Sequence, residues 1–357
     1  MSSQTKPHRA QPQPTLARLA AEAGVSVSAV SRILAGKKLD TFLPETVARV
    51  KAAAEKFRYR PNRLVRGIQT GRTGLVGVVI PAYNDFYGMV MAGIHDHLME
   101  HDRLPVVLWS GADAVGQQGR AELEQIHSLV DLRVEGVILK PVFDAASDQY
   151  MHEIIERNIP LVVVDRALPR VHACFAGSDD DVAMAKSLDF LKSLGHRCIA
   201  YFGPATTVST GVQRLQSFRV FMAQEPDLHG REFLTGEWRT NCGEAEAFLR
   251  GAGEVTAVVA VNDRFAHAVC EAAKLLGRRV PQDLSVIGHG NLPVSTYMTP
   301  SLTTVEQHPY EIGRSAARRL LARIEKPPEP CRKVLIPPDL IVRDSTGPAP
   351  HLYAAGS

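Results

Sequence analysis

The stretch that decides the fold runs from residue 15 to residue 68 and reads TLARLAAEAGVSVSAVSRILAGKKLDTFLPETVARVKAAAEKFRYRPNRLVRGI. Its first apolar residues recur at helical spacing until Gly24 interrupts the pattern. Ser26 then supplies an oxygen that can cap a second helix over residues 27–35. The beginning of the stretch therefore predicts a helix, a tight turn and another helix.

A third short helix is expected after the second. Gly36 can end the second helix in a left-handed conformation, and Pro44 suits the first position of a new helix because its φ is already helical. The apolar residues of this third helix fall on one face: Val47, Val50, Ala54 and Phe57. We predict that the three helices share one small apolar core.

The second helix divides its residues between that core and an outer face. Val30, Ile33 and Leu34 are expected inside. The outer face holds Val27, Ser28, Ser31 and Arg32. These are short or hydrogen-bonding side chains that fit a DNA major groove, and the planar fork of Arg32 matches a guanine edge. The alternative is that Arg32 is a solvated surface arginine on a generic helical bundle.

This region resembles the headpiece of the LacI/GalR family of bacterial transcription regulators. The matching motifs are Thr15-Leu16, A-x-x-A-G-V-S at 20–26, V-S-R at 30–32, Glu45-Thr46, Tyr59, Pro61-Asn62 and T-G-R-T-G at 70–74. The resemblance implies a DNA-binding set in which Val27, Ser28 and Arg32 contact bases. The rest of the set is Thr15, Ser26, Ser31, Thr46 and Asn62 on phosphates, with Tyr59 and Ile68.

The chain departs from the family pattern in the headpiece and in the linker that follows. Ala35 and Leu43 replace the usual asparagine and the usual serine cap, which puts one phosphate contact and one cap in doubt. In relatives the linker forms a hinge helix on DNA, and Ile68 stands where they insert a leucine between base pairs. Val65 and Gly67 weaken that match. A plain flexible linker is the alternative.

Charge and cysteine usage agree with a regulator inside the cell. Residues 1–74 hold 14 Lys and Arg against 4 Asp and Glu, whereas the remainder holds 27 against 34. A basic head on an acidic body suits a polyanion at one end, and the head lacks the apolar face of a membrane-surface helix. The 5 cysteines show no C-x-x-C pair, and residues 1–14 show no apolar signal segment. We expect a cytoplasmic protein with no membrane span.

From Leu75 onward, short apolar runs alternate with helical stretches. The expected strands are 75–81, 105–109, 136–141, 160–165, 174–178, 198–203, 232–236, 256–261 and 284–289. Helices are expected around 87–101, 117–130, 147–157, 180–194, 212–223, 242–250 and 264–276. This alternation predicts an α/β core of two doubly wound parallel-sheet subdomains, with small molecules bound at the carboxyl ends of the strands.

The resemblance extends to Ser345 and implies a core of the periplasmic binding protein type I kind. The segments are expected as an N-terminal tail at 1–14, a helix-turn-helix headpiece at 15–58, a hinge at 59–74, a core at 75–345 and a C-terminal tail at 346–357. Within the core, the first subdomain is expected at 75–165 and 293–325, and the second at 166–292 and 326–345. The run 302–323 would thus return to the first subdomain, and 332–343 would close the second.

Several polar and aromatic residues follow the predicted strands. Asp165 ends an apolar strand, where a charge needs a ligand, a cap or an ion pair. The resemblance places an effector against Phe86, Asp165, Arg214, Trp238 and Asn262, although Asn262 could instead cap a helix. Loop position alone adds Asp113 and Phe143. Gly290 stands where relatives carry an aspartate, so we expect Asn291 or water to replace that acceptor.

We predict a sequence-specific DNA-binding transcription regulator, a repressor, that acts as a homodimer on a pseudo-palindromic operator. A carbohydrate-like effector bound between the subdomains would control it, without a cofactor. No catalytic motif is present, and zinc at His95, His97 and His101 is less expected than solvation of these histidines. The alternatives are a sugar-binding protein, which would need a signal peptide, and a sugar-processing enzyme using Asp165 with His289.

Overall fold

A computed structural model describes residues 14–36, 38–60, 67, 72–81, 85–110, 118–141, 147–167, 173–206, 208–236, 242–326 and 330–350. The chain forms two compact units, a head over Met1–Thr73 and a core over Gly74–Ser357. The unit boundary lies one residue before the predicted start of the core at 75.

The head contains the three predicted helices, α1 (Leu16–Ala23), α2 (Val27–Leu34) and α3 (Pro44–Lys56). Leu19, Val30, Ile33 and Val50 form their shared core and are almost fully buried. Pro44 occupies the first turn of α3, and Leu43 before it makes no side-chain cap. The loss of that cap was expected from the sequence, whereas a short 3-10 helix, η1 (Leu39–Thr41), was not.

The first sheet of the core is entirely parallel, with strand order β11-β5-β4-β3-β1-β2. Its strands are β1 (Leu75–Pro81), β2 (Leu104–Ser110), β3 (Val137–Leu139), β4 (Leu161–Val164), β5 (Cys174–Ser178) and β11 (Lys333–Ile336). Alternate side chains of β1 point to opposite faces, so Val76 and Val78 enter one apolar cluster and Val79 enters the other. Each face is therefore buried under helices.

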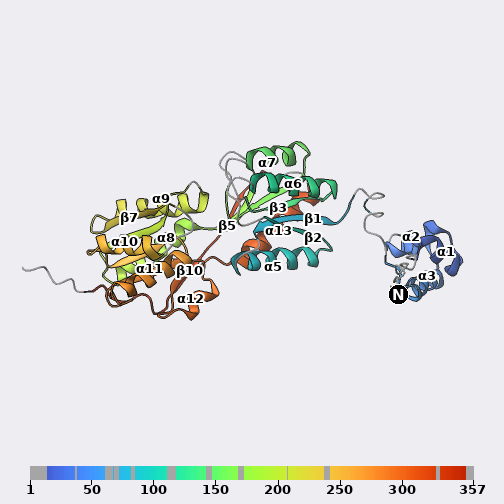
Figure 1. Cartoon of the computed structure of the whole chain (residues 1–357). Helices are drawn as coiled ribbons and strands as arrows, with labels where there is room; N and C mark the ends of the chain where they lie inside the picture. Colours follow the sequence, from blue (N-terminus) through green and yellow to red (C-terminus); the bar gives the residue numbers. More distant parts are fainter. Residues whose placement is uncertain are drawn as a thin grey trace, which may run out of the picture. The chain divides into compact units, whose positions relative to one another are not determined.

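Two pairs of helices cover this sheet, as Figure 1 shows. On one face lie α5 (Asp85–Glu100) and α13 (Pro309–Glu325), and on the other α6 (Gln118–Asp131) and α7 (Ser147–Glu156). The backbones of α5 and α13 approach closely at two glycines. A Cβ added at Gly93 would lie 2.0 Å from the Tyr310 carbonyl oxygen, and one at Gly313 would lie 1.9 Å from the Val90 oxygen.

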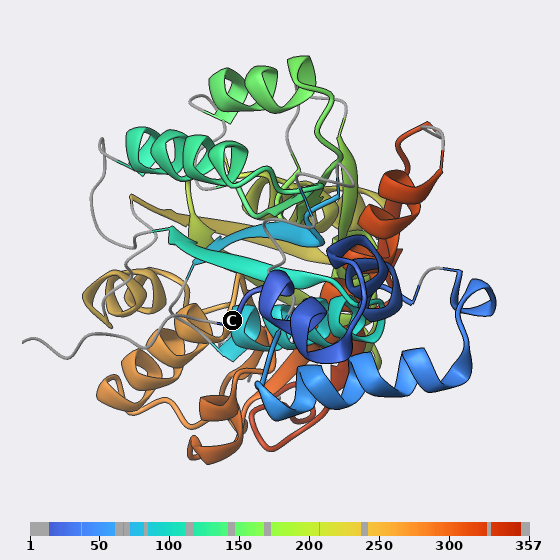
Figure 2. The same cartoon turned by 90° about the vertical axis from the view of Figure 1, so that its right-hand side faces the viewer.

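The second sheet has the order β12-β10-β9-β8-β6-β7. Its strands are β6 (Cys198–Pro204), β7 (His229–Thr235), β8 (Ala257–Ala260), β9 (Ser285–His289), β10 (Thr303–Glu306) and β12 (Asp339–Ile341). Only β12 is antiparallel to its neighbour in this sheet. Helices accompany the strands (Figure 1; the last two are orange in Figure 2): α8 (Asp180–Ser193), α9 (Ser209–Gln224), α10 (Cys242–Gly251), α11 (Asp263–Leu275) and α12 (Pro293–Tyr297).

The predicted division of the core between subdomains was wrong at each crossover. The chain leaves the first sheet after Ser178, not after residue 165, because β5 pairs with β4. The chain returns to the first sheet after Glu306 and not after residue 292. Within the run 302–323, β10 pairs with β9 of the second sheet, and α13 packs on the first sheet. The run 332–343 then serves both sheets, with β11 beside β5 and β12 beside β10.

Candidate DNA-binding and effector-binding sites

Local hydrogen bonds set the two helices of the head in place. The Thr15 hydroxyl oxygen accepts from the Arg18 N–H at 3.3 Å, and Ser26 Oγ accepts from the Ala29 N–H at 3.2 Å. Gly24 between the helices has a φ of 64°, a left-handed value that glycine adopts without strain. Thr15 and Ser26 thus hold the amino ends of α1 and α2, where a DNA phosphate is favourably bound.

The outer face of α2 has the composition expected for reading DNA. Val27 is 46% exposed, Ser28 and Arg32 are exposed, and Ser31 is half-buried. The Arg32 guanidinium lies over the Phe42 ring, 5.2 Å from its centroid, and its Nε donates to the Ser28 carbonyl oxygen at 3.4 Å. These contacts limit the conformations of Arg32 while leaving its terminal nitrogens outside the apolar core.

Of the other predicted DNA contacts, the structure describes Thr46 and Tyr59. Thr46 is half-buried in the first turn of α3, where its N–H donates to the Leu43 carbonyl oxygen at 2.9 Å. Tyr59 packs against the apolar core of the head, and burial raises the pKa of its phenol. Asn62 and Ile68 lie outside the described residues, so their roles stay predictions.

At the carboxyl end of β4, Asp165 has the left-handed φ of 63°. Its Oδ2 accepts a hydrogen bond from the Tyr87 hydroxyl at 2.6 Å, and burial together with the Asp165 charge holds the pKa of Tyr87 well above its usual value. The predicted aromatic residue Phe86 packs edge-on against Tyr87 with 5.2 Å between ring centroids. Lys140 follows β3 and is almost fully buried, and its Nζ lies 5.4 Å from the centroid of the Tyr87 ring.

A second charged group lies in the other subdomain around Arg214 of α9. Its Nε donates to Asp180 Oδ1 at 2.9 Å, its Nη1 donates to the Val261 carbonyl oxygen at 2.8 Å, and both side chains are buried. Burial raises the pKa of Asp180 despite the adjacent guanidinium. The His289 Nε2 atom lies 3.4 Å from the same Asp180 oxygen, and burial with the Arg214 charge lowers the pKa of His289 well below its usual value.

These two groups face a common region at the carboxyl ends of the strands. Burial, and to a smaller extent the charge of Asp165, raises the pKa of Asp180. Asp180 foremost, and Asp165 after it, raises the pKa of Arg214 against the effect of burial. The Ala167 N–H also donates to Ser209 Oγ of α9 at 3.0 Å. Within the described part of the chain, three buried polar atoms here have no hydrogen-bond partner: Ser178 Oγ, Tyr201 Oη and His289 Nε2. Such atoms suit a polar ligand.

Other predicted effector contacts are engaged differently or lie outside the described residues. Asn262 caps α11, since its Oδ1 accepts from the Phe265 N–H at 3.1 Å, which was the alternative role. The Asn291 amide donates to Glu306 at 2.7 Å and accepts from Arg343 at 2.7 Å, so an effector would have to replace one of these bonds. Trp238, Asp113 and Phe143 are not among the described residues.

Sequence reasoning overlooked Tyr87 and Asp180 and considered His289 only as a proton-transfer partner. Asp180 follows β5 in the run Asp179-Asp180-Asp181, where Asp179 is the cap of α8. Its position after a buried strand was the available signal. Tyr87 had no such signal, because it becomes a partner of Asp165 only through the packing of α5 on the first sheet.

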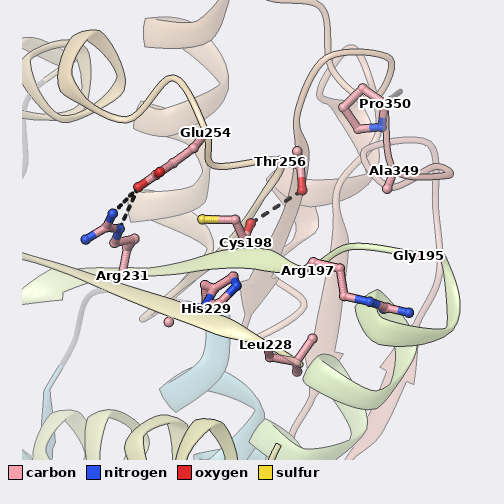
Figure 3. Close-up of a pocket in the computed structure, with 11 residues that line it drawn as sticks. Gly195, Arg197, Cys198, Leu228, His229, Arg231, Glu254, Thr256, Ala349 and Pro350 are labelled. Atoms are coloured by element: carbon pink, nitrogen blue, oxygen red, sulfur yellow. Dashed lines mark hydrogen bonds and ion pairs between the residues drawn. The ribbon is translucent and has the colours of Figure 1, made fainter. Parts of the chain in front are cut away.

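A hollow of about 750 Å³ opens at the amino ends of β6, β7 and β8, the opposite edge of the sheet from Arg214 and His289. Figure 3 shows Arg231 and Glu254 pairing with each other on its wall, beside Cys198 and Thr256. Residues of the C-terminal segment, Ala349 and Pro350, close one side. Its charged residues are partly paired among themselves, and we do not assign the effector to it.

Two of the histidines considered as zinc ligands lie together at the end of α5, His97 in its last turn and His101 directly after it. One nitrogen each of His97 and His101 and a Glu100 oxygen lie within 4.8 Å of one another. Glu100, however, forms two hydrogen bonds of 2.9 Å with Arg314. The His101 Nδ1 atom also bonds the His97 carbonyl oxygen at 2.9 Å. A metal would have to displace Arg314, and His95 is not part of the group.

Comparison with known proteins agrees with this architecture. Residues 15–62 match "Bacterial regulatory proteins, lacI family", and residues 188–346 match a "Periplasmic binding protein-like domain". The HTH-type transcriptional regulator PtxS of Pseudomonas aeruginosa is 30% identical over 338 residues, which cover 94% of this chain and 96% of that protein. The chain belongs to the lacI family of bacterial regulatory proteins.

Solved structures support the same fold for this LacI-family regulator. A lac repressor dimer bound to operator and the anti-inducer ONPF has a TM-score of 0.78 at 23% identity and covers 94% of this chain and 99% of its own. A complex of the transcriptional regulator CelR with cellobiose has a TM-score of 0.65 at 26% identity, with 93% and 99% covered. The predicted helix-turn-helix head and two parallel-sheet subdomains are therefore confirmed. Because the chain belongs to the lacI family, the protein is a DNA-binding transcription regulator.

Within the described helices, none is long and apolar enough to cross a membrane.

Proposed function

We propose that this LacI-family regulator acts in the cytoplasm as a homodimeric repressor on a pseudo-palindromic operator and that a carbohydrate-like effector controls its affinity for DNA. The exposed α2 face with Val27, Ser28 and Arg32 is the observation that supports operator reading. One head reads too few base pairs to be specific, so a two-fold symmetric operator needs two copies of the chain.

Arg32 is the side chain on which base reading most depends. Replacing Arg32 by alanine should weaken operator binding by about 1–3 kcal/mol and relax preference at one base pair of each half-site, because a bidentate arginine–guanine contact is lost. Fluorescence anisotropy with the operator and with single-base variants measures both effects. Arg49→Ala removes the same charge from an exposed position of α3 and should leave the base preference unchanged. An unchanged preference in Arg32→Ala would contradict base reading.

The effector is proposed to bind between Asp165, Tyr87 and Phe86 on one side and Arg214, Asp180 and His289 on the other. A sugar offers hydroxyls that both accept from a guanidinium and donate to a carboxylate, and its C–H face packs on an aromatic ring. Of the predicted residues, Phe86, Asp165 and Arg214 belong to this set, and Trp238, Asn262 and Asn291 stay secondary candidates. The CelR relative is in complex with cellobiose, which favours a saccharide as the first class to test.

Asp165→Asn is a sharp test of this site. Asparagine tolerates the left-handed backbone of Asp165 and can still accept from the Tyr87 hydroxyl, so the change removes mainly a negative charge. We expect effector affinity to fall about tenfold or more, in line with a lost charge-assisted hydrogen bond, and effector-free operator binding to be retained. Asp102→Asn is the matched control, because Asp102 also has a left-handed φ but lies at the amino end of β2.

The effector itself is to be found by a thermal-shift screen of the full chain against sugars, sugar acids and nucleosides. Each compound that stabilises the protein is then tested for its effect on operator affinity. Asp165→Asn should lose the stabilisation, whereas Asp102→Asn should keep it. A ligand that stabilises both variants equally would bind elsewhere and would contradict the proposed site.

A further inference from the structure

Two cysteines that are 157 positions apart in sequence have their sulfur atoms in contact in the first sheet. Cys174 begins β5, and Cys331 precedes the edge strand β11 by two residues. These strands pair in parallel, with Lys333 opposite Phe175 and the Phe175 N–H donating to the Arg332 carbonyl oxygen at 3.3 Å. The two sulfur atoms are 2.8 Å apart and form a hydrogen bond between thiols.

The two thiols differ in their exposure to solvent and in their neighbours. Cys174 is fully buried, whereas Cys331 is exposed. Arg323 of α13 points a guanidinium nitrogen at Cys174 Sγ from 3.6 Å. Burial alone would raise the pKa of Cys174, but hydrogen bonding with Cys331 and Arg319 and the charge of Arg323 lower it. Burial and the neighbouring Cys174 raise the pKa of Cys331.

We propose that Cys174 and Cys331 are a reversible dithiol site that a small-molecule disulfide oxidises to an intramolecular disulfide. Of the two sulfurs, external disulfide reaches the exposed Cys331, which loses its proton and attacks one sulfur of the reagent. This step forms a mixed disulfide and releases the first small thiolate. Cys174, as the thiolate favoured by Arg323, then attacks the Cys331 sulfur and releases the second.

The exchange is balanced and requires little movement. Two protein thiols lose two electrons and two protons, and the small disulfide takes them up as two thiols. Because a disulfide bond is about 2 Å long, the sulfur atoms need to approach by less than about 1 Å. The product would fasten the edge strand β11 to β5, immediately before the chain crosses to β12. In a reducing cytoplasm such a bond forms only transiently, which suits a redox-responsive site.

The other cysteines provide internal controls. Cys198 is half-buried and Cys270 is buried, whereas Cys331 is exposed. No other pair of cysteine sulfurs is in hydrogen-bond contact in the described part of the chain. Cys198→Ser thus removes a thiol without touching the proposed site.

The test is a titration of the full native chain with mixtures of reduced and oxidised glutathione, read by intact mass and by peptide mapping. The wild type and Cys198→Ser should lose a pair of hydrogen atoms and yield one linked peptide containing Cys174 and Cys331, and dithiothreitol should reverse this. Cys174→Ser should instead accumulate glutathione on Cys331. Cys331→Ser should react at Cys174 at least about tenfold more slowly than the wild type closes its disulfide.

Three results would overturn the proposal. One is a wild type that keeps all of its thiols in excess oxidised glutathione. Another is a wild type that retains glutathione on Cys331 without forming the linked peptide. The third is equal reaction of Cys174 in the presence and absence of Cys331. The wild-type peptide map needs no variant, so the result does not depend on whether either serine substitution folds.

Discussion

At the scale of single residues, His289 should give the core a distinct pH dependence. The pKa of His289 is lowered by burial and by Arg214, so the folded chain resists a proton that the unfolded chain accepts near pH 6.5. The stabilising effect of the neutral ring is complete above that pH and declines as pH falls below it. The cost of His289→Gln, measured by urea unfolding, should therefore shrink by about 1 kcal/mol between pH 7.5 and pH 5.5.

The control for this comparison is His229→Gln, which changes an exposed histidine at the start of β7. Its effect on the free energy of unfolding should stay constant over the same pH range. Asp180, whose pKa burial raises, is present in every protein compared. A pH-independent cost for His289→Gln would show that this ring is not held neutral by its surroundings.

Residue-level prediction from sequence succeeded where the cause is local. Ser26 and Gly36 act on backbone within four positions of themselves, so their roles as cap and helix end could be read directly. In contrast, the contact of Tyr87 with Asp165 and the contact of Asp180 with Arg214 and His289 form only when segments distant in the sequence pack together. Asn262 shows the same limit. An asparagine between a strand and a helix is expected both for a helix cap and for an effector contact, and only the structure shows that it caps α11.

At the scale of elements, the contact between α5 and α13 depends on glycine. Gly93→Ala would place a methyl group 2.0 Å from a backbone oxygen of α13, and backbone cannot rotate away as a side chain can. We expect the free energy of unfolding of the core to fall by about 1–3 kcal/mol or more, as in other overpacked interiors. Denaturant unfolding of the full chain, followed by far-ultraviolet circular dichroism, measures the change.

Gly88→Ala is the matched control in the same helix, since nothing lies within 4 Å of its added Cβ. An exposed glycine-to-alanine change inside a helix should be neutral or stabilise by up to about 1 kcal/mol. Equal effects of the two substitutions would mean that the helices separate without cost. Helical periodicity predicted α5, whereas α13 was not among the predicted helices, and the close approach of the two has no signal in either segment alone.

The same limit explains why the longer elements up to β9 were predicted, whereas the short strands after it and the assignment of strands to sheets were not. Apolar runs and helical periodicity identify β1 or α11 because each buries a long stretch of its own sequence. By contrast, β10 and β11 have four residues each and were not among the predicted strands. Which sheet each joins is decided by hydrogen bonds to β9 and β5, which lie far away in the chain.

At the scale of the whole molecule, regulation requires that DNA and effector bias the same equilibrium. The core crosses between its two sheets after Ser178, Glu306 and Ile336, so a change in one subdomain can reach the other through three connections. If an effector weakens operator binding by some factor, thermodynamic linkage requires operator to weaken effector binding by the same factor. A corepressor would strengthen both equally.

This reciprocity can be measured once an effector is identified. Calorimetric titration of effector into the free protein and into the operator complex gives one factor, and operator anisotropy with and without saturating effector gives the other. The two factors should agree, and Asp165→Asn should lower effector affinity in both titrations by a similar ratio, because it alters the ligand contact and not the coupling. A variant that abolishes the operator response while binding effector normally would place Asp165 in the coupling between sites, contrary to a direct role in holding the ligand.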